Sequence, residues 1–95
     1  MTDGLDRLRE AQRRTWAAGD YAEVGKNLVP ASEAVVARAG IGPGMAVLDV
    51  ATGTGNAALL AAGAGADVTG VDFTPGLLEV ARERARGAGL DAEFV

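Results

Sequence analysis

Residues 47–56 read VLDVATGTGN, and this stretch decides the fold. Residues 46–50 are apolar apart from Asp49, which is typical of a short buried strand. Gly53 and Gly55 then fit the pattern G-x-G-x-x-G/A, in which glycines permit a tight turn and let a ligand approach the backbone. An Ala- and Leu-rich segment follows and reads as a helix. This order favours a cofactor site at the turn, with a plain strand-to-helix turn as the alternative.

The same alternation continues to the end of the sequence. Residues 67–71 predict a second strand, and Thr74-Pro75 places a cap and a first-turn proline at the start of a helix. Glycines at 87 and 89 end that helix, and residues 92–95 begin a third strand. Strands alternating with helices predict an α/β, Rossmann-like half-domain with a parallel sheet of strand order 3-2-1, part of an incomplete doubly wound fold.

The first 40 residues predict helices rather than strands. Residues 5–18 and 21–29 read as helical, and Pro30 is expected to break the second stretch. Ser32 would then cap a further short helix. The chain therefore divides into a helical region, residues 1–40, and an α/β region, residues 41–95.

Composition excludes several classes of function. The chain has no Cys and no His, which excludes disulfides, zinc sites built on these ligands and a Ser-His-Asp triad, so no metal is expected. Residues 41–76 carry three Asp and neither Lys nor Arg, which argues against nucleic acid as a partner. The N-terminus lacks a signal-peptide layout, and no apolar run approaches the ~18 residues of a membrane span. A cytoplasmic protein that does not associate with membranes is expected.

Two acids indicate the kind of cofactor. Asp72 follows the second strand, 19 residues after Gly53, where a carboxylate can accept both ribose hydroxyls of an adenosine. Its alternative role is to cap the helix that starts at Pro75, although Thr74 is better placed for that. Asp49 lies within an apolar strand, where a carboxylate is costly unless it is bound by a ligand or by backbone donors.

The negative charge of these acids distinguishes between two candidate cofactors. A dinucleotide would place its pyrophosphate at the turn, where Asp49 would repel it. S-adenosylmethionine has no phosphate and carries a sulfonium and an ammonium, which an acidic turn attracts. Electrostatics thus favours S-adenosylmethionine over NAD. The alternatives are an NAD-binding fragment of an oxidoreductase and a non-catalytic assembly module.

A known family shares these features. Residues 47–56 resemble motif I of class I S-adenosylmethionine-dependent methyltransferases, and residues 70–75 resemble the segment that follows it in that family. Residues 16–21, with Leu28 and Pro30, are similar to the N-terminal lid region of the ubiquinone/menaquinone-biosynthesis methyltransferase-like group. The resemblance extends over nearly the whole chain.

The resemblance assigns roles to residues of the turn, of the second strand's end and of the lid. It implies that Asp49 faces the methionine end of the cofactor and that Ala51, Gly53 and Gly55 line the turn against it. Asp72 would hold the ribose, and Phe73 would pack near the adenine. Tyr21 and Gly25 would contact the cofactor from the lid. These cofactor-binding residues are Asp49, Ala51, Gly53, Gly55, Asp72, Phe73, Tyr21 and Gly25. Ala51 stands where the family most often has its first glycine.

The resemblance also implies a reaction and a boundary. Residues 1–40 would form the lid region, and residues 41–95 the first half of the S-adenosylmethionine-binding domain of a methyltransferase. The acceptor would be a small molecule, and no catalytic residue is assigned. The family continues past the third strand, so we expect this chain to be an inactive cofactor-binding fragment. Residues 46–50 would then form an open sheet edge through which chains associate with each other.

Overall fold

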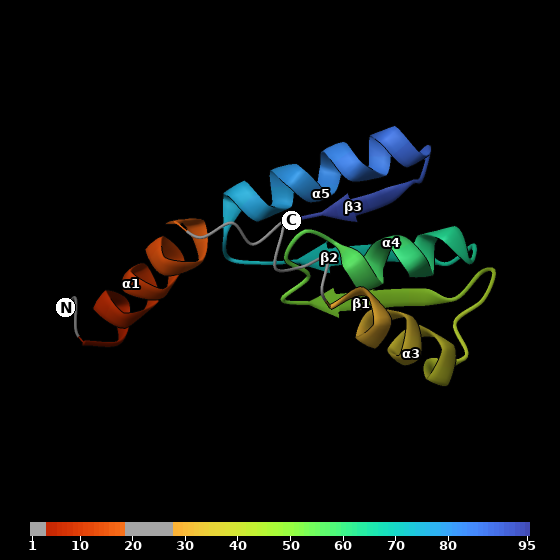
Figure 1. The fold of residues 1–95 in the computed structure, drawn as a ribbon, viewed down its shortest axis with the longest axis horizontal. Coiled ribbons are helices and arrows are strands. Elements are labelled where there is room, and N and C mark those ends of the chain that lie inside the picture. Colours follow the sequence, from red (N-terminus) through yellow and green to blue (C-terminus); the bar gives the residue numbers. More distant parts are fainter. Residues whose placement is uncertain (1–3, 19–27) are drawn as a thin grey trace.

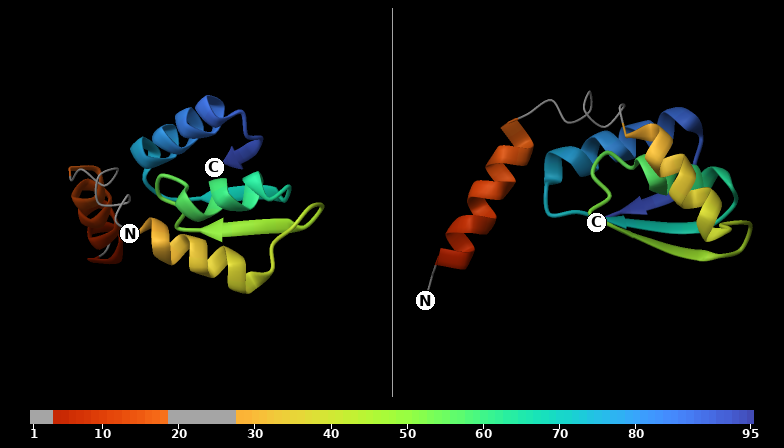
Figure 2. Two further views of the ribbon diagram at one scale, coloured as in Figure 1. Left: turned by 45° about the vertical axis from the view of Figure 1, so that its right-hand side comes forward. Right: turned by 60° about the horizontal axis from the view of Figure 1, so that its bottom comes forward.

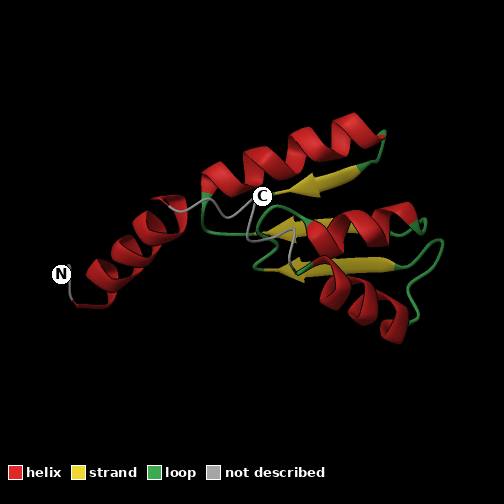
Figure 3. Ribbon diagram, viewed as in Figure 1, coloured by secondary structure: helices red, strands yellow, loops and turns green. Residues whose placement is uncertain are grey.

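A computed structural model of the chain describes residues 4–18 and 28–95. The described helices and strands alternate from residue 46 onward, as the sequence predicts (Figures 1 and 3). In chain order they are α1 (Gly4–Ala18), α3 (Val29–Ala39), β1 (Ala46–Val50), α4 (Asn56–Gly63), β2 (Asp67–Val71), α5 (Pro75–Ala88) and β3 (Ala92–Phe94). None of the described helices is both long and apolar enough to cross a bilayer.

The three strands form one parallel sheet in the order β1-β2-β3, which confirms the predicted order 3-2-1. Ala46 is paired with Asp67, and Val68 with Ala92, so the strands run side by side with their carboxyl ends at one edge of the sheet. Each crossover moves one strand further in the same direction. Right-handed crossovers of this kind place their helices on the same face, and Figure 2 shows α4 and α5 there, with α3 beside α4.

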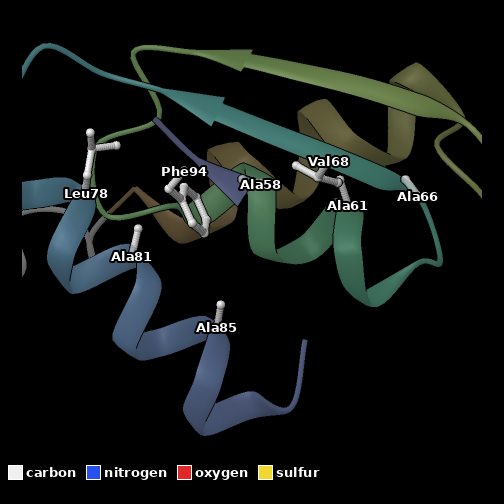
Figure 4. Close-up of a cluster of buried hydrophobic side chains, with 8 residues drawn as sticks. All are labelled: Ala58, Ala61, Ala66, Val68, Leu78, Ala81, Ala85 and Phe94. Atoms are coloured by element: carbon white, nitrogen blue, oxygen red, sulfur yellow. The ribbon is translucent and has the colours of Figure 1, made fainter. Parts of the chain in front are cut away.

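The core lies between this face and the helices, and it is built mainly from small side chains. The ring of Phe94 lies between α4 and α5 (Figure 4). Alanines let both helices approach the sheet closely, and larger side chains fill the remaining space. The buried apolar residues are Ala58, Ala61, Ala66, Val68, Leu78, Ala81, Ala85 and Phe94.

Burial along β1 alternates, because helices cover one face of the sheet. Val47 and Asp49 point toward the helices and are half-buried. Leu48 and Val50 point to the opposite face, where their side chains are 64% and 70% exposed. A strand that is apolar on both faces usually has both faces covered. Among the described residues only one face of β1 is covered.

Most predicted boundaries agree with the structure, and the exceptions are Gly87, which lies inside α5 so that Gly89 alone ends that helix, and the start of α3. Pro30 lies in the first turn of α3, which begins at Val29, where a missing N–H costs nothing, and most of the helix predicted over residues 21–29 lies outside the described residues. Leu28, rather than Ser32, is the N-cap residue. The predictions for Tyr21 and Gly25 lie outside the described residues.

Candidate functional site

The turn between β1 and α4 contains three left-handed residues. Ala51, Gly53 and Gly55 have φ angles of +58°, +58° and +86°. Glycine adopts this conformation without penalty, whereas an alanine there costs about 1–2 kcal/mol. The turn is closed by the N–H of Gly55, which donates to the carbonyl of Thr52 at 2.9 Å. Ala51, where the resembling family most often has glycine, is therefore held in a strained conformation by its surroundings.

Gly55 faces the core rather than the space above the turn. A Cβ atom at this position would lie 3.2 Å from the Phe94 ring and 3.3 Å from the Cβ of Ala81. Both the positive φ angle and this close approach therefore favour glycine over residues with a Cβ. Gly55 is buried and does not line the adjacent cleft. Its predicted contact with a cofactor stays a prediction, and its structural role is to let α4 start against β3.

Asp72 links the carboxyl end of β2 to the turn that follows β1. Its Oδ2 atom accepts a hydrogen bond from the Gly53 N–H at 2.9 Å, and its Oδ1 atom accepts one from the Thr74 N–H at 2.9 Å. An ionised carboxylate offers about four acceptor positions. Two of them hold the protein, and the others remain for hydroxyl groups of a ligand. The carboxylate is half-buried and its orientation is fixed before any ligand arrives.

Thr74 occupies the predicted cap position of α5, but its side chain does not cap the helix. Its hydroxyl is buried, with 1% of the residue exposed, and has no hydrogen-bond partner among the described residues. The prediction that Thr74 is the better cap is therefore wrong for the side chain. Asp72 accepts a hydrogen bond from the N–H of Thr74, the N-cap residue itself, and its predicted contact with a ribose stays a prediction.

Asp49 lies on the helix-covered face of β1, next to the turn. Its Oδ2 atom accepts a hydrogen bond from the Thr52 hydroxyl at 2.8 Å. Thr52 is buried and its N–H donates to the Val71 carbonyl at 2.9 Å, so the hydroxyl is firmly placed. The Thr52 hydroxyl thus stabilises the carboxylate of Asp49 within the strand. The half-buried side chain of Asp49 still faces the cleft.

A cleft of about 670 Å³ lies where the carboxyl ends of β1 and β2 meet the helices. Open α/β sheets bind ligands at this edge. The cleft brings together five of the predicted residues, from two strand ends that are far apart in sequence. Its lining consists of Asp49, Ala51, Gly53, Asp72 and Phe73 among the predicted residues, with Leu28, Ser32, Thr52, Thr54, Asn56, Ala57, Thr74 and Leu77.

At the α3 end of this cleft, the sequence predicts a similarity to the lid region for Leu28 and a helix cap at Ser32, but a cleft contact for neither residue. Leu28 and Ser32 line it, although they precede Ala51, the first residue of the turn, by 23 and 19 residues. No local pattern marks them, because only the packing of α3 beside α4 brings them there (Figure 2). Phe73 is 43% exposed at the cleft, which makes its ring accessible to a flat ligand.

The cleft is acidic. Asp49 and Asp72 are the ionisable side chains among its described lining residues. Two carboxylates that line one cleft attract cations and repel phosphates. The site therefore suits a ligand that carries positive charge and hydroxyl groups, which is the charge pattern deduced from the sequence.

Comparison with known proteins agrees with this site. A model of the methyltransferase domain family matches residues 47–95, from β1 through the turn, both crossover helices and β3. This chain belongs to the methyltransferase domain family. The match begins with the strand that carries Asp49 and includes Asp72, so the resemblance drawn from residues 47–56 and 70–75 is confirmed.

Three similar proteins show how far the likeness extends. An uncharacterized protein of Mycobacterium tuberculosis is 46% identical over 88 residues, which are 92% of this chain and 32% of that protein. The demethylmenaquinone methyltransferase of Thermus thermophilus is 45% identical over 51 residues, 52% of this chain and 23% of the enzyme. The structure of a TehB-like S-adenosylmethionine-dependent methyltransferase from Corynebacterium glutamicum superimposes with a TM-score of 0.62 at 26% identity, covering 90% of this chain and 45% of the other.

These matches show how much of the length of its relatives the chain covers. The chain spans about a third of the length of its mycobacterial relatives. The structural likeness to the Corynebacterium glutamicum methyltransferase also confirms the Rossmann-like fold predicted from the alternating strands and helices.

Proposed function

We propose that this chain binds S-adenosylmethionine and forms the cofactor side of a methyltransferase. The observation that supports this most strongly is the acidic cleft, in which Asp72 is oriented by the N–H groups of Gly53 and Thr74. Membership of the methyltransferase domain family supports it too. So do the names of two similar proteins, a demethylmenaquinone methyltransferase and an S-adenosylmethionine-dependent methyltransferase.

Each end of the cofactor has a proposed partner in the cleft. The two acceptor positions left on Asp72 take the ribose hydroxyls, and the exposed ring of Phe73 packs against the adenine. Asp49, held by Thr52, faces the methionine end and its ammonium group. Ala51 and Gly53 bring the backbone close to the ligand between these ends. Tyr21 and Gly25 remain proposed lid contacts.

The chemistry of methyl transfer suits such a site. When bound between Asp49 and Asp72, the cofactor would supply a methyl group on a sulfonium, which an acceptor nucleophile would take while the electron pair of the carbon–sulfur bond would leave with sulfur as a neutral thioether. The reaction depends on alignment and on exclusion of water more than on a protein base. Because the chain matches only about a third of its mycobacterial relatives, we propose cofactor binding, and not complete catalysis, as the activity of residues 1–95.

In this proposal, two regions of the chain form the cofactor site. Residues 41–95 form the first half of the cofactor-binding domain, and residues 1–40 form a lid region over it. The position of Leu28 and Ser32 in the cleft lining supports the lid. The acceptor is a small molecule, the chain does not bind nucleic acid, and its location is cytoplasmic.

We also propose that copies of the chain associate through β1. In the described sheet β1 pairs with β2 alone, so its other edge carries unpaired N–H and C=O groups. Leu48 and Val50 add exposed apolar surface beside that edge. Residues 46–50 contain no Lys or Pro, which edge strands use to discourage pairing.

Calorimetry on the folded chain tests the cofactor assignment. We expect S-adenosylhomocysteine and S-adenosylmethionine to bind more tightly than NAD, because NAD must place a pyrophosphate beside Asp49. Asp72→Asn is expected to weaken binding. Asp91→Asn is the matched control, since Asp91 is an exposed acid that does not line the cleft.

Two results would contradict the assignment. Tighter binding of NAD would favour the oxidoreductase alternative. Flat titrations with every cofactor, on a chain shown to be folded by circular dichroism, would favour a non-catalytic assembly module.

A further inference from the structure

A cation on α5 reaches the turn that follows β1. The Nη1 atom of Arg84 lies 2.7 Å from the carbonyl oxygen of Thr54 and 2.8 Å from Oδ1 of Asn56. The same nitrogen lies 3.2 Å from the Thr54 hydroxyl. These acceptors are 30 and 28 residues away in sequence. Thr54 and Asn56 both line the cleft, whereas Arg84 does not.

Two charges of opposite sign therefore hold two peptide groups of one turn. The carboxylate of Asp72 accepts from the Gly53 N–H, and the guanidinium of Arg84 donates to the Thr54 carbonyl. Hydrogen bonds with an ionised partner are shorter and about twice as strong as neutral ones. The peptide between Thr54 and Gly55 is fixed at both ends, because the Gly55 N–H donates to Thr52.

This restraint matters because the turn is conformationally unusual. Gly53 and Gly55, with φ angles of +58° and +86°, are the residue type with the widest choice of backbone conformations. Without restraints such a turn samples many shapes, and a ligand then has to select one of them, which reduces its affinity. A cation fixed by three acceptors limits that sampling.

We propose that Arg84 is a positioning residue, which holds residues 53–56 in the shape that receives the cofactor and does not itself touch the cofactor. The proposal rests on the proposed binding of S-adenosylmethionine. A purely structural role, in which Arg84 only ties α5 to the rest of the fold, is the competing explanation. Arg82 offers the comparison, since its Nη2 atom donates to the Phe94 carbonyl at 2.7 Å, away from the cleft lining.

The test compares Arg84→Gln, Arg84→Lys, Arg82→Gln and Arg86→Gln. Backbone hydrogen exchange is measured without ligand at the turn, residues 53–56, and in β2. Binding of S-adenosylhomocysteine is measured by calorimetry. Arg84→Gln should speed exchange at the turn about tenfold, leave β2 unchanged and weaken binding about tenfold, the scale of one charge-assisted hydrogen bond. Arg84→Lys should recover part of both, because it keeps the charge.

The controls separate the two explanations. Arg86→Gln should match the parent, and Arg82→Gln should change exchange in β3 without affecting the turn or ligand binding. If Arg84→Gln had the same hydrogen-exchange rates at the turn and the same affinity for S-adenosylhomocysteine as the parent, the positioning role of Arg84 would be overturned. The cofactor assignment would remain intact. Equal acceleration in the turn and in β2 would show a purely structural role. A parent that fails to bind S-adenosylhomocysteine would overturn the cofactor assignment, and the positioning role with it.

Discussion

The Oδ2 atom of Asp72 lies 2.9 Å from the backbone nitrogen of Gly53, which donates a hydrogen bond to it. This contact joins the turn after β1 to the end of β2, across 19 residues of sequence. Each of the two residues was assigned to the cofactor site on its own. The structure shows that one orients the other, so substitutions at Asp72 act on the turn as well as on the ligand.

Asp72→Ala should therefore reduce both affinity and stability. The variant loses two acceptor positions for the ribose and leaves the N–H groups of Gly53 and Thr74 without their carboxylate. We expect roughly 1–3 kcal/mol weaker binding of S-adenosylhomocysteine by calorimetry, and a loss of similar size in the free energy of unfolding by urea denaturation. Parental affinity in a folded variant would show that the ribose does not lie at Asp72.

Asp49→Asn should weaken binding selectively. The substitution keeps the shape of the side chain and an oxygen for the Thr52 hydroxyl, but it removes the charge that attracts the ligand ammonium. S-adenosylhomocysteine should lose roughly 1–3 kcal/mol of binding free energy. Methylthioadenosine, which has no ammonium, should bind as it does to the parent. Equal losses for both ligands would place Asp49 near another part of the cofactor.

Gly70→Ala should destabilise the fold because β2 passes close to its neighbours. A Cβ atom there would lie 2.8 Å from Cδ1 of Phe94 and 2.8 Å from Oγ1 of Thr52. Overpacking of this kind costs about 1–3 kcal/mol of unfolding free energy, measurable by urea denaturation. Gly87→Ala is the control: that position lies in α5 with nothing within 4 Å of a Cβ, so it should gain about 0.5–1 kcal/mol. Equal effects would refute this account.

Association of chains through β1 should depend on protein concentration and on the side chains beside the unpaired edge of β1. Sedimentation velocity of the parent should show larger species as concentration rises. Val50→Lys places a charge beside the edge on the exposed face and should shift the equilibrium toward monomer. Val35→Lys, at an exposed position of α3, should leave association unchanged. A monomer at every concentration, with residues 46–50 protected from hydrogen exchange, would contradict the proposal.

Local sequence determined the elements that position the site. The predicted strands over residues 46–50 and 67–71 have the bounds of β1 and β2, because both are short runs with β-branched residues, bounded by segments that favour turns. Thr74-Pro75 and Gly89 likewise mark the ends of α5. The acidic cleft could be anticipated as well, since parallel strands must present their carboxyl ends at one edge.

Tertiary structure alone decided which atoms meet. The hydrogen bonds of Asp72 and Arg84 to the turn join residues 19 and 30 positions apart, and they depend on strand register and on how α5 packs. The place of Leu28 in the cleft and the approach of Phe94 to Gly70 depend on the same packing. Periodicity and capping residues report only the local backbone, within a few residues. Contacts between distant segments depend on how the surfaces of helices and strands fit together. Those surfaces exist only in the folded chain, so local sequence patterns do not reveal the contacts.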